Sequence, residues 1–340
     1  MLLEICFVKV LFIFIAVMHF LGGKKFMNHW EMENVVTLGV ALTDAGFDVS
    51  QICCSRQSCF DFIAKKAERV ALVKVHSEVD SLSVQDWREL KVIAERVSAA
   101  SLVVSQRTHE HMLEDDTVYM RYSVFVVTAK TLRNVAVETA FPLIYAGPGG
   151  YSVEVDGELV EKRRKKLGLS VGQLAELIKV SRRTLYGYER CMAKASVGSA
   201  YNLAKALGVP VAKPIDVLRP AEKQRQCLLR RSKRAVEEQL MLRKVFRNFA
   251  CCDVTHVHRA PFDFVVNVPD ERLVILGAVA ADGERLLDER VEEILSICRV
   301  IGAYPVLVTE RAKTSAKDIF CVGLDELTKV HSPEELVASI

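Results

Sequence analysis

Residues Val171–Arg190 read VGQLAELIKVSRRTLYGYER, a stretch that predicts two short helices joined by a tight turn. Helices that cross at a steep angle need a small residue at the crossing, and Ala175 supplies it. The apolar residues of the stretch fall at spacings that turn them to one inner side: Leu174, Ile178, Val180, Leu185 and Tyr188. Ser181 stands where the second helix needs an N-cap, because its hydroxyl can accept a hydrogen bond from a backbone N–H.

The outward face of the second helix is expected to read DNA. Arg can donate two hydrogen bonds to guanine O6 and N7, whereas Thr and Tyr hydroxyls reach phosphates. The outward residues are Arg182, Arg183, Tyr186 and Gly187, with Thr184 at the edge of the face. The predicted DNA-binding residues are Gln173, Ser181, Arg182, Arg183, Thr184, Tyr186 and Gly187. The candidates for phosphate contacts are Arg163, Arg164 and Lys179.

This pattern resembles the lambda-repressor/Cro-like helix-turn-helix family. The resemblance runs from Leu159 to Leu218 and includes a first helix, LVEKRRKKLGLS, and a fourth helix over Val197–Leu207 that Gly208 closes. The family usually has Gln at the start of its second helix to contact a phosphate, where this chain has Val171, so Gln173 replaces that contact only in part. The turn position, often Gly in the family, is Lys179, and a left-handed backbone there costs about 1 kcal/mol.

The charge of the chain is unevenly distributed. The whole sequence carries 46 Lys and Arg against 43 Asp and Glu, and its formal net charge of +3 argues against a nucleic-acid partner. Gly157–Arg247, however, holds 22 basic and 8 acidic residues, whereas the rest of the chain holds 24 and 35. Basic runs bracket the helix-turn-helix: Lys162–Lys166 before it, and Arg230, Arg231, Lys233 and Arg234 after it. This segregation indicates a polyanionic partner, double-stranded DNA, for the middle of the chain.

The sequence on either side of this basic segment repeats itself. Phe60-Asp61-Phe62 recurs as Phe262-Asp263-Phe264, at an offset of 202 residues. Leu102–Arg107 matches Val306–Arg311 at an offset of 204, and Val124–Val127 resembles Ile319–Val322 in the same order. We therefore expect two copies of one α/β unit, built on β-branched strands and amphipathic helices. The expected helices are Met32–Ala45 and Val84–Ala99 in the first copy, and Lys233–Arg247 and Glu289–Ile301 in the second.

The expected fold class is α/β plus all-α, with two repeated, degenerate nuclease-like α/β units flanking a helix-turn-helix domain. We divide the chain into an apolar N-terminal extension (1–26), the first repeat (27–150), the helix-turn-helix domain (151–220) and the second repeat (221–340). Ala146–Gly150 lacks the Gly-Lys-Ser/Thr ending of a phosphate loop, so we interpret it as a hinge. This layout is similar to an archaeal family of HTH-type transcriptional regulatory proteins, and the similarity implies a DNA-binding regulator.

An enzymatic alternative depends on Asp61 and Lys74. Restriction-endonuclease-like nucleases hold a metal ion with an Asp and with a second acid two residues before a Lys. Leu72 occupies that acid position here, and in the second copy Gly277 is expected in place of Lys74 and Ile275 in place of the acid. One carboxylate is a poor ligand set for Mg²⁺, so we expect a scaffold without catalysis and keep a metal-dependent nuclease as the alternative. In a purely structural role, Asp61 and Asp263 would accept bonds from the backbone.

The cysteines and the N-terminus indicate the compartment. Two clusters, Cys53-Cys54-x4-Cys59 and Cys251-Cys252 with His256 and His258, lack the paired spacing of structural zinc ligands. We therefore expect reduced, buried thiols, no metal and no cofactor. Residues 1–26 are apolar, but they contain Glu4 and lack an A-x-A cleavage site. Three interpretations stay open for them: a start placed upstream of the true one at Met27, a membrane anchor, or a core segment.

The sequence as a whole predicts a cytoplasmic, non-enzymatic regulator of transcription that binds double-stranded DNA as a homodimer. Two-fold symmetry would place two recognition helices on half-sites ~34 Å apart. The α/β repeats would dimerise, sense a small-molecule effector or contact the transcription machinery, and no membrane partner is expected.

Overall fold

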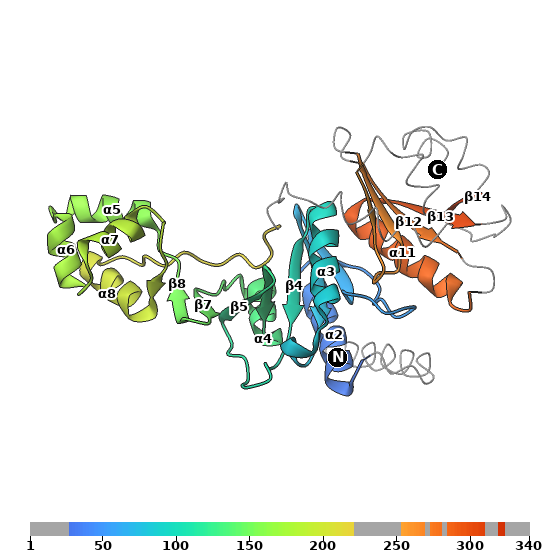
Figure 1. The fold of residues 1–340 in the computed structure, drawn as a ribbon, viewed down its shortest axis with the longest axis horizontal. Coiled ribbons are helices and arrows are strands. Elements are labelled where there is room, and N and C mark those ends of the chain that lie inside the picture. Colours follow the sequence, from blue (N-terminus) through green and yellow to red (C-terminus); the bar gives the residue numbers. More distant parts are fainter. Residues whose placement is uncertain (1–26, 221–252, 269–272, 281–283, 310–318, 324–340) are drawn as a thin grey trace. The chain divides into compact units, whose positions relative to one another are not determined.

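The computed structural model describes residues 27–220, 253–268, 273–280, 284–309 and 319–323 (Figure 1). The chain forms two compact units, one made of the residues up to Leu102 and from Leu218 onward, and the other of Val103–Val217. These units group the chain differently from the ranges 27–150, 151–220 and 221–340, which stay a prediction. The apolar extension, the expected helix Lys233–Arg247 and the second basic run all lie outside the described residues.

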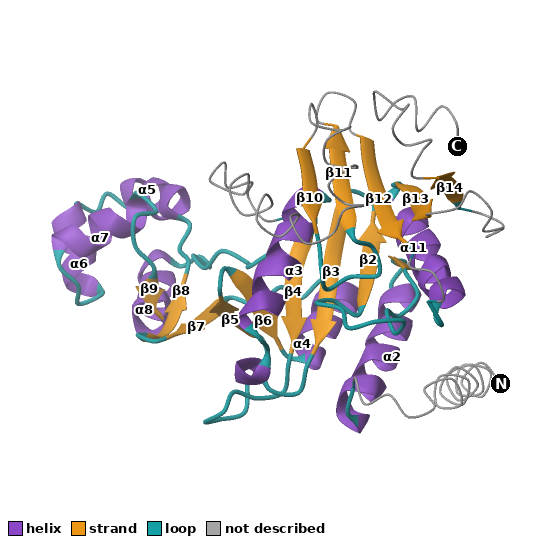
Figure 2. Ribbon diagram, turned by 45° about the vertical axis from the view of Figure 1, so that its right-hand side comes forward, coloured by secondary structure: helices purple, strands orange, loops and turns teal. Residues whose placement is uncertain are grey.

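The first repeat supplies two helices, three strands and the start of a fourth strand to the first unit (Figure 2). Its elements are α2 (His29–Asp44), β1 (Asp48–Val49), β2 (Phe62–Lys66), β3 (Arg69–Val75), a 3-10 turn (Val79–Ser81), α3 (Val84–Arg96) and β4 (Ala100–Val104). The strands lie in that order in the sheet, and β1, β2 and β3 are antiparallel. Both helices begin with a capping box, formed by Asn28 with Glu31 and by Ser83 with Asp86. Strand β4 is buried along its whole length, which explains its continuous apolar sequence.

The second repeat has the same strand order, which confirms the duplicated α/β unit. Its elements are β10 (Asp253–His256), β11 (Phe264–Val268), β12 (Leu273–Val279), α11 (Leu287–Ile301), β13 (Tyr304–Thr309) and β14 (Phe320–Gly323). Strands β10, β11 and β12 are antiparallel, and β13 and β14 continue the sheet in parallel. In the first repeat Phe62 lies opposite Val73, and in the second Phe264 lies opposite Gly277.

This register corrects one correspondence expected from the sequence. Because Gly277 matches Val73, the residue that matches Lys74 is Ala278, and the one that matches Leu72 is Leu276. The offset between the copies changes from 202 at β2 to 204 at β3, and this change displaced the expected positions, Gly277 and Ile275, by one residue. Both repeats still lack the second carboxylate of a nuclease site, because Leu72 and Leu276 occupy its two positions.

The two repeats pack against each other in a pseudo-symmetric way. Helix α3 of the first repeat contacts β11 of the second, and helix α11 of the second contacts β2 of the first. The equivalent residues Phe60 and Phe262 meet with their ring centroids 6.3 Å apart. Such mutual exchange of equivalent contacts is the signature of an isologous interface, which here lies within one chain.

The second unit carries a small sheet followed by the helix-turn-helix region. Its strands are β5 (Thr117–Arg121), β6 (Val124–Val127), β7 (Ile144–Gly147), β8 (Gly150–Val153) and β9 (Ala195–Ser196), in the order β6-β5-β7-β8-β9. A short helix, α4 (Ala129–Arg133), continues into a π-helical turn (Asn134–Glu138). The expected hinge at Ala146–Gly150 is wrong: Gly147 pairs with Gly150 across an antiparallel hairpin, so the segment is a tight turn.

Candidate nucleic-acid interface and nuclease-like repeats

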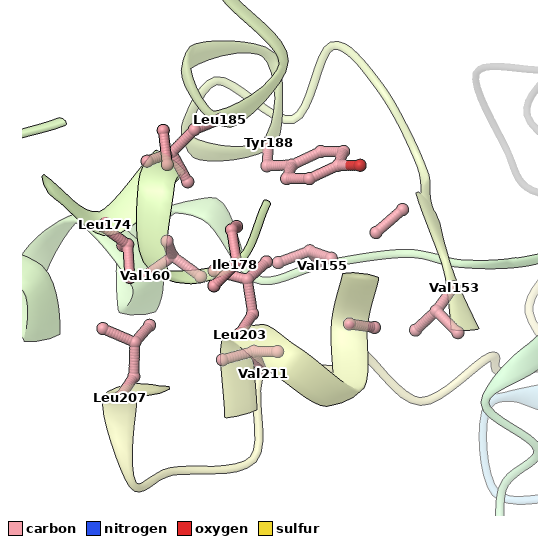
Figure 3. Packing of buried hydrophobic residues seen from close by; sticks show 13 residues of the cluster. Val153, Val155, Val160, Leu174, Ile178, Leu185, Tyr188, Leu203, Leu207 and Val211 are labelled. Carbon is pink, nitrogen blue, oxygen red and sulfur yellow. The ribbon is translucent and has the colours of Figure 1, made fainter. Parts of the chain in front are cut away.

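Four helices of the second unit surround one apolar core (Figure 3). They are α5 (Gly157–Lys166), α6 (Val171–Leu177), α7 (Arg182–Glu189) and α8 (Val197–Leu207). The residues expected on the inner side are buried in this core: Leu174, Ala175, Ile178, Leu185 and Tyr188, with Val180 packed against them. Val160 of α5 and Leu203 of α8 complete it, so the short helices α6 and α7 are held by tertiary packing.

The turn between α6 and α7 has the local geometry that the sequence predicted. Lys179 adopts a left-handed backbone with φ of 58°, and its N–H donates to the carbonyl of Glu176 at 3.1 Å. Ser181 is the N-cap of α7, and its Oγ accepts from the N–H of Thr184 at 3.0 Å. The turn therefore fixes where the first residues of α7 lie relative to α6.

Helix α7 separates its buried and exposed side chains cleanly. Arg182 and Arg183 are exposed in its first turn, and Tyr186 is 51% exposed one turn later. The Arg190 guanidinium lies 5.5 Å from the centroid of the Tyr186 ring, which orients that ring. Gly187 is half-buried, and a Cβ built on it would lie 3.6 Å from that of Ala193. The exposed face consists of two guanidinium groups and a phenol.

Two other predicted DNA-binding residues, Gln173 and Thr184, already form local hydrogen bonds. Gln173 closes a capping box at the start of α6, where its Oε1 accepts from the N–H of Ser170 at 2.8 Å. The Thr184 hydroxyl lies 2.8 Å from that of Ser181. Gln173 keeps its amide N–H₂ for a ligand, because the capping box uses the side-chain oxygen.

The two arginines proposed for phosphates are used inside the fold. Arg164 is 9% exposed at its side chain and forms an ion pair with Glu189, at 2.6 Å from Nε to Oε1 and 3.0 Å from Nη2 to Oε2. Its third nitrogen, Nη1, donates to the carbonyl of Leu169 at 3.0 Å. Arg163 is half-buried, and its Nε donates to the carbonyl of Leu207 at 2.9 Å, which caps α8. Arg164 therefore ties α5 to α7 and is not available on the surface, whereas Lys179 is exposed.

The acidic residues of the nuclease-like repeats accept backbone bonds in equivalent places. Asp61 Oδ2 accepts from the N–H of Val75 at 2.6 Å, and Asp263 Oδ2 accepts from the N–H of Val279 at 2.7 Å. Asp61 Oδ1 lies 2.8 Å from Lys74 Nζ. Burial alone would lower the pKa of Lys74, but the adjacent Asp61 carboxylate outweighs it and raises that pKa. Asp263 of the second repeat is paired instead with Arg56 of the first repeat and with Arg290 of the second.

These centres do not fit a catalytic metal ion. Both oxygens of Asp61 are bonded within the protein, and the position two before Lys74 is the buried Leu72. Within the described ranges, no group of three or more His, Cys, Asp or Glu residues is placed to hold a metal. Burial raises the pKa of the Cys54 thiol to about 12, and it also raises the pKa values of the buried Cys53 and Cys59 thiols. Cys251 and Cys252 lie outside the described residues.

The repeats are joined by a pair of glutamates that no sequence motif indicated. Glu89 Oε2 accepts from the N–H groups of His258 and Arg259 at 2.9 and 2.8 Å. Glu293 Oε1 accepts from those of Cys54 and Ser55 at 2.6 and 2.7 Å. The two glutamates are 204 residues apart, the same offset as between the flanking strands, and that offset was the signal that could have revealed them.

Comparisons with known proteins match both parts of the chain. The model of a PD-(D/E)XK superfamily domain matches residues 32–142, and a helix-turn-helix model matches residues 160–213. A Methanosarcina acetivorans protein named "Putative HTH-type transcriptional regulatory protein" is 31% identical over 310 residues, covering 88% of this chain and 93% of its own. This chain belongs to that family of HTH-type transcriptional regulatory proteins.

Further relatives of this HTH-type regulatory family are archaeal. A Methanocaldococcus jannaschii protein of the same name is 30% identical, with 84% of this chain and 89% of the relative covered. Among solved structures, the restriction-modification controller protein C.AhdI from Aeromonas hydrophila is 32% identical over 16% of this chain and 80% of its own, with a TM-score of 0.15. None of the described helices is long and apolar enough to cross a membrane.

Proposed function

We propose that the protein is a cytoplasmic regulator of transcription that binds double-stranded DNA and reads the major groove with α7. The observation that carries the proposal is the division of α7 into a buried face, Leu185 and Tyr188, and an exposed face with Arg182, Arg183 and Tyr186. Arg182 and Arg183 would donate to guanine O6 and N7, because a guanidinium fits those two acceptors bidentately. Tyr186, Thr184 and Ser181 would contact the flanking backbone.

The charge around α7 supports a polyanionic ligand. Gly157–Arg219 holds 13 Lys and Arg against 5 Asp and Glu. Lys179 is exposed beside the start of α7, and Gln173 is exposed near the start of α6. We propose both as phosphate contacts, while Arg164 is left out because Glu189 holds it. Arg163 would reach a phosphate only with the guanidinium nitrogens that the Leu207 carbonyl does not use.

The proposed regulator acts as a homodimer without an enzymatic activity. Paired recognition helices would contact half-sites about one turn of DNA apart, ~34 Å. The nuclease-like repeats would serve assembly, sensing of an effector or contact with the transcription machinery, because their acidic charge opposes binding to DNA. Division into repeats 27–150 and 221–340 around a domain at 151–220 is part of this proposal.

Removing the two arginines tests the proposal. We expect Arg182→Ala with Arg183→Ala to weaken binding to a duplex selected from a random library by roughly tenfold to a hundredfold per arginine, since each bidentate contact discriminates between bases by about 1–3 kcal/mol. Fluorescence anisotropy at fixed salt measures the affinity, and a random duplex of equal length reports the non-specific part.

The matched control is Lys205→Ala, an exposed lysine on α8 away from the proposed reading face. This variant should bind the selected duplex nearly as well as the unchanged protein. Equal affinity of the double arginine variant and the unchanged protein, with melting temperatures also equal, would contradict the assignment of α7.

A metal-dependent nuclease is the second candidate, favoured by the PD-(D/E)XK match and by the Asp61–Lys74 pair. The missing second carboxylate at Leu72 opposes it. Incubating the protein with duplex and branched DNA in Mg²⁺ or Mn²⁺ decides between the two. Cleavage that disappears in Asp61→Ala would reverse the ranking.

A further inference from the structure

A cavity of about 360 Å³ lies in the first unit, at the position of the Asp61–Lys74 pair. This volume is within the range of small-molecule sites, which is about 300–1,000 Å³. The cavity is lined by residues of α2, of the loop before β2, of β3 and of the segment that leads into the first turn of α3, and Arg259 of the second repeat completes it. It is therefore a composite site that requires both repeats.

Three cationic side chains line the cavity. Arg56, Lys74 and Arg259 line the cavity against two acids, Asp61 and Asp86. Each cation has a carboxylate partner: Lys74 pairs with Asp61, Arg259 pairs with Asp86, and Arg56 pairs with Asp263, which does not line the cavity. His76, also in the lining, lies 2.7 Å from Glu31. Burial alone would raise the pKa of Glu31, but hydrogen bonds from His76, Ser77 and Asn28 outweigh it and bring that pKa to about 2.

Two of these cations keep donors for a ligand. Arg259 Nη1 donates to Ser83 Oγ at 3.1 Å and to Asp86 Oδ1 at 2.7 Å, while its Nε and Nη2 have no acceptor among the described residues. Lys74 Nζ donates to the Ser58 carbonyl at 3.1 Å and to Asp61 Oδ1 at 2.8 Å, which leaves its third N–H. Asp86 and Asp61 hold both cations in place, so ligand binding would cost little side-chain ordering.

The rest of the lining is apolar enough to hold a hydrocarbon group. Met32 is buried, and Met27 and Leu82 are half-buried at the wall. The Cys53 and Cys54 thiols also line it, and their raised pKa values keep them neutral. A ligand with both an oxyanion and an apolar part satisfies this combination.

We propose that this cavity binds a small organic monocarboxylate, whose oxyanion lies between Arg259 and Lys74 and whose apolar part contacts Met32 and Leu82. A carboxylate matches the fork formed by Nε and Nη2 of the Arg259 guanidinium, and its second oxygen can accept the third N–H of Lys74. The assignment goes beyond the proposed DNA-binding function, and its test uses no operator DNA.

Calorimetric titration of the full-length protein with benzoate tests the site. We expect benzoate to bind, and Arg259→Met to weaken this binding about tenfold or more through the loss of a charge-assisted bond. Leu82→Trp should abolish it by filling the cavity while leaving every ion pair intact. Arg88→Met is the matched control, because Arg88 is exposed on α3 and does not line the cavity, and it should leave the affinity unchanged.

Three further compounds test which part of benzoate the cavity recognises. Benzyl alcohol lacks the charge, acetate lacks the ring and phenyl phosphate carries a second charge, so each should bind more weakly than benzoate. If Arg259→Met lowers the melting temperature, Leu82→Trp, which keeps the Arg259–Asp86 pair, decides the outcome. The proposal fails if benzoate does not bind, if all variants bind it equally, if benzyl alcohol or phenyl phosphate binds better, or if a non-specific duplex displaces it.

Discussion

At the scale of single residues, Lys179 combines a backbone cost with a proposed contact. Its φ of 58° is a conformation that favours glycine, and the lysine side chain costs about 1 kcal/mol there. We expect Lys179→Gly to increase the free energy of unfolding of the helix-turn-helix region by at most about 1 kcal/mol, and so to raise its melting temperature. The same change should weaken DNA binding and reduce the salt slope by about 0.9, because one proposed phosphate contact is lost.

Lys179→Arg is the control for this pair of opposite effects, since it keeps both the charge and the Cβ. It should change neither the stability nor the salt slope. A less stable Lys179→Gly variant would show that the lysine side chain stabilises the turn, and an unchanged salt slope would remove Lys179 from the interface.

At the scale of elements, the contact between α5 and α7 depends on Gly157. A Cβ built on Gly157 would lie 2.3 Å from the Glu189 carbonyl oxygen and 2.5 Å from that of Tyr188. Gly157→Ala must therefore push the two helices apart, against the Arg164–Glu189 ion pair that joins them. We expect a loss of about 1–3 kcal/mol in the free energy of unfolding, measured by thermal or urea denaturation.

Gly198, at the second residue of α8, offers a matched substitution. A Cβ built there has no atom within 4 Å. Gly198→Ala should stabilise the helix by up to about 1 kcal/mol, because alanine has the higher helix propensity. Equal stability of the Gly157→Ala variant and the unchanged protein would mean that α5 can shift without cost.

At the scale of the whole molecule, the described parts of the two repeats form one interface within the first unit. Arg56 of the first repeat lies 2.8 Å from Asp263 of the second, and also donates to the carbonyls of Ala260 and Phe262. We expect Arg56→Ala to destabilise this unit by about 2 kcal/mol, because buried acceptors of the second repeat lose their donor. Hydrogen exchange should show reduced protection in β10–β12 as well as in β2 and β3.

The exposed Arg88 provides the reference substitution, and Arg88→Ala should leave protection unchanged in both repeats. Loss of protection confined to the first repeat would contradict the cooperative pairing of the two copies. Asp263 keeps Arg290 as a partner in the Arg56→Ala variant, so the effect measured is that of the bridge between repeats.

Local patterns were enough to predict the helix-turn-helix. The apolar spacing of α6 and α7, the Ser181 cap and the left-handed Lys179 all depend on residues within one or two turns of each other. The duplicated strands were also readable, because each copy keeps its β-branched runs and its Phe-Asp-Phe sequence. Neighbouring residues decide such features, so they appear in the sequence itself.

Only the tertiary structure decided which charged side chains are exposed and which residues of the two repeats correspond to each other. Arg164 was expected on the surface, but its partner Glu189 lies 25 residues away and brings it into the interior. Glycine permits both a hinge and a tight turn, and at Ala146–Gly150 the pairing of β7 with β8 decides for the turn. The sequence thus determined the helix-turn-helix and the repeat, whereas long-range pairing decided that the repeats join through Glu89 and Glu293 and that Arg259 of the second repeat lines a cavity of the first. The physical reason is that burial and partnership depend on segments brought together from distant parts of the chain.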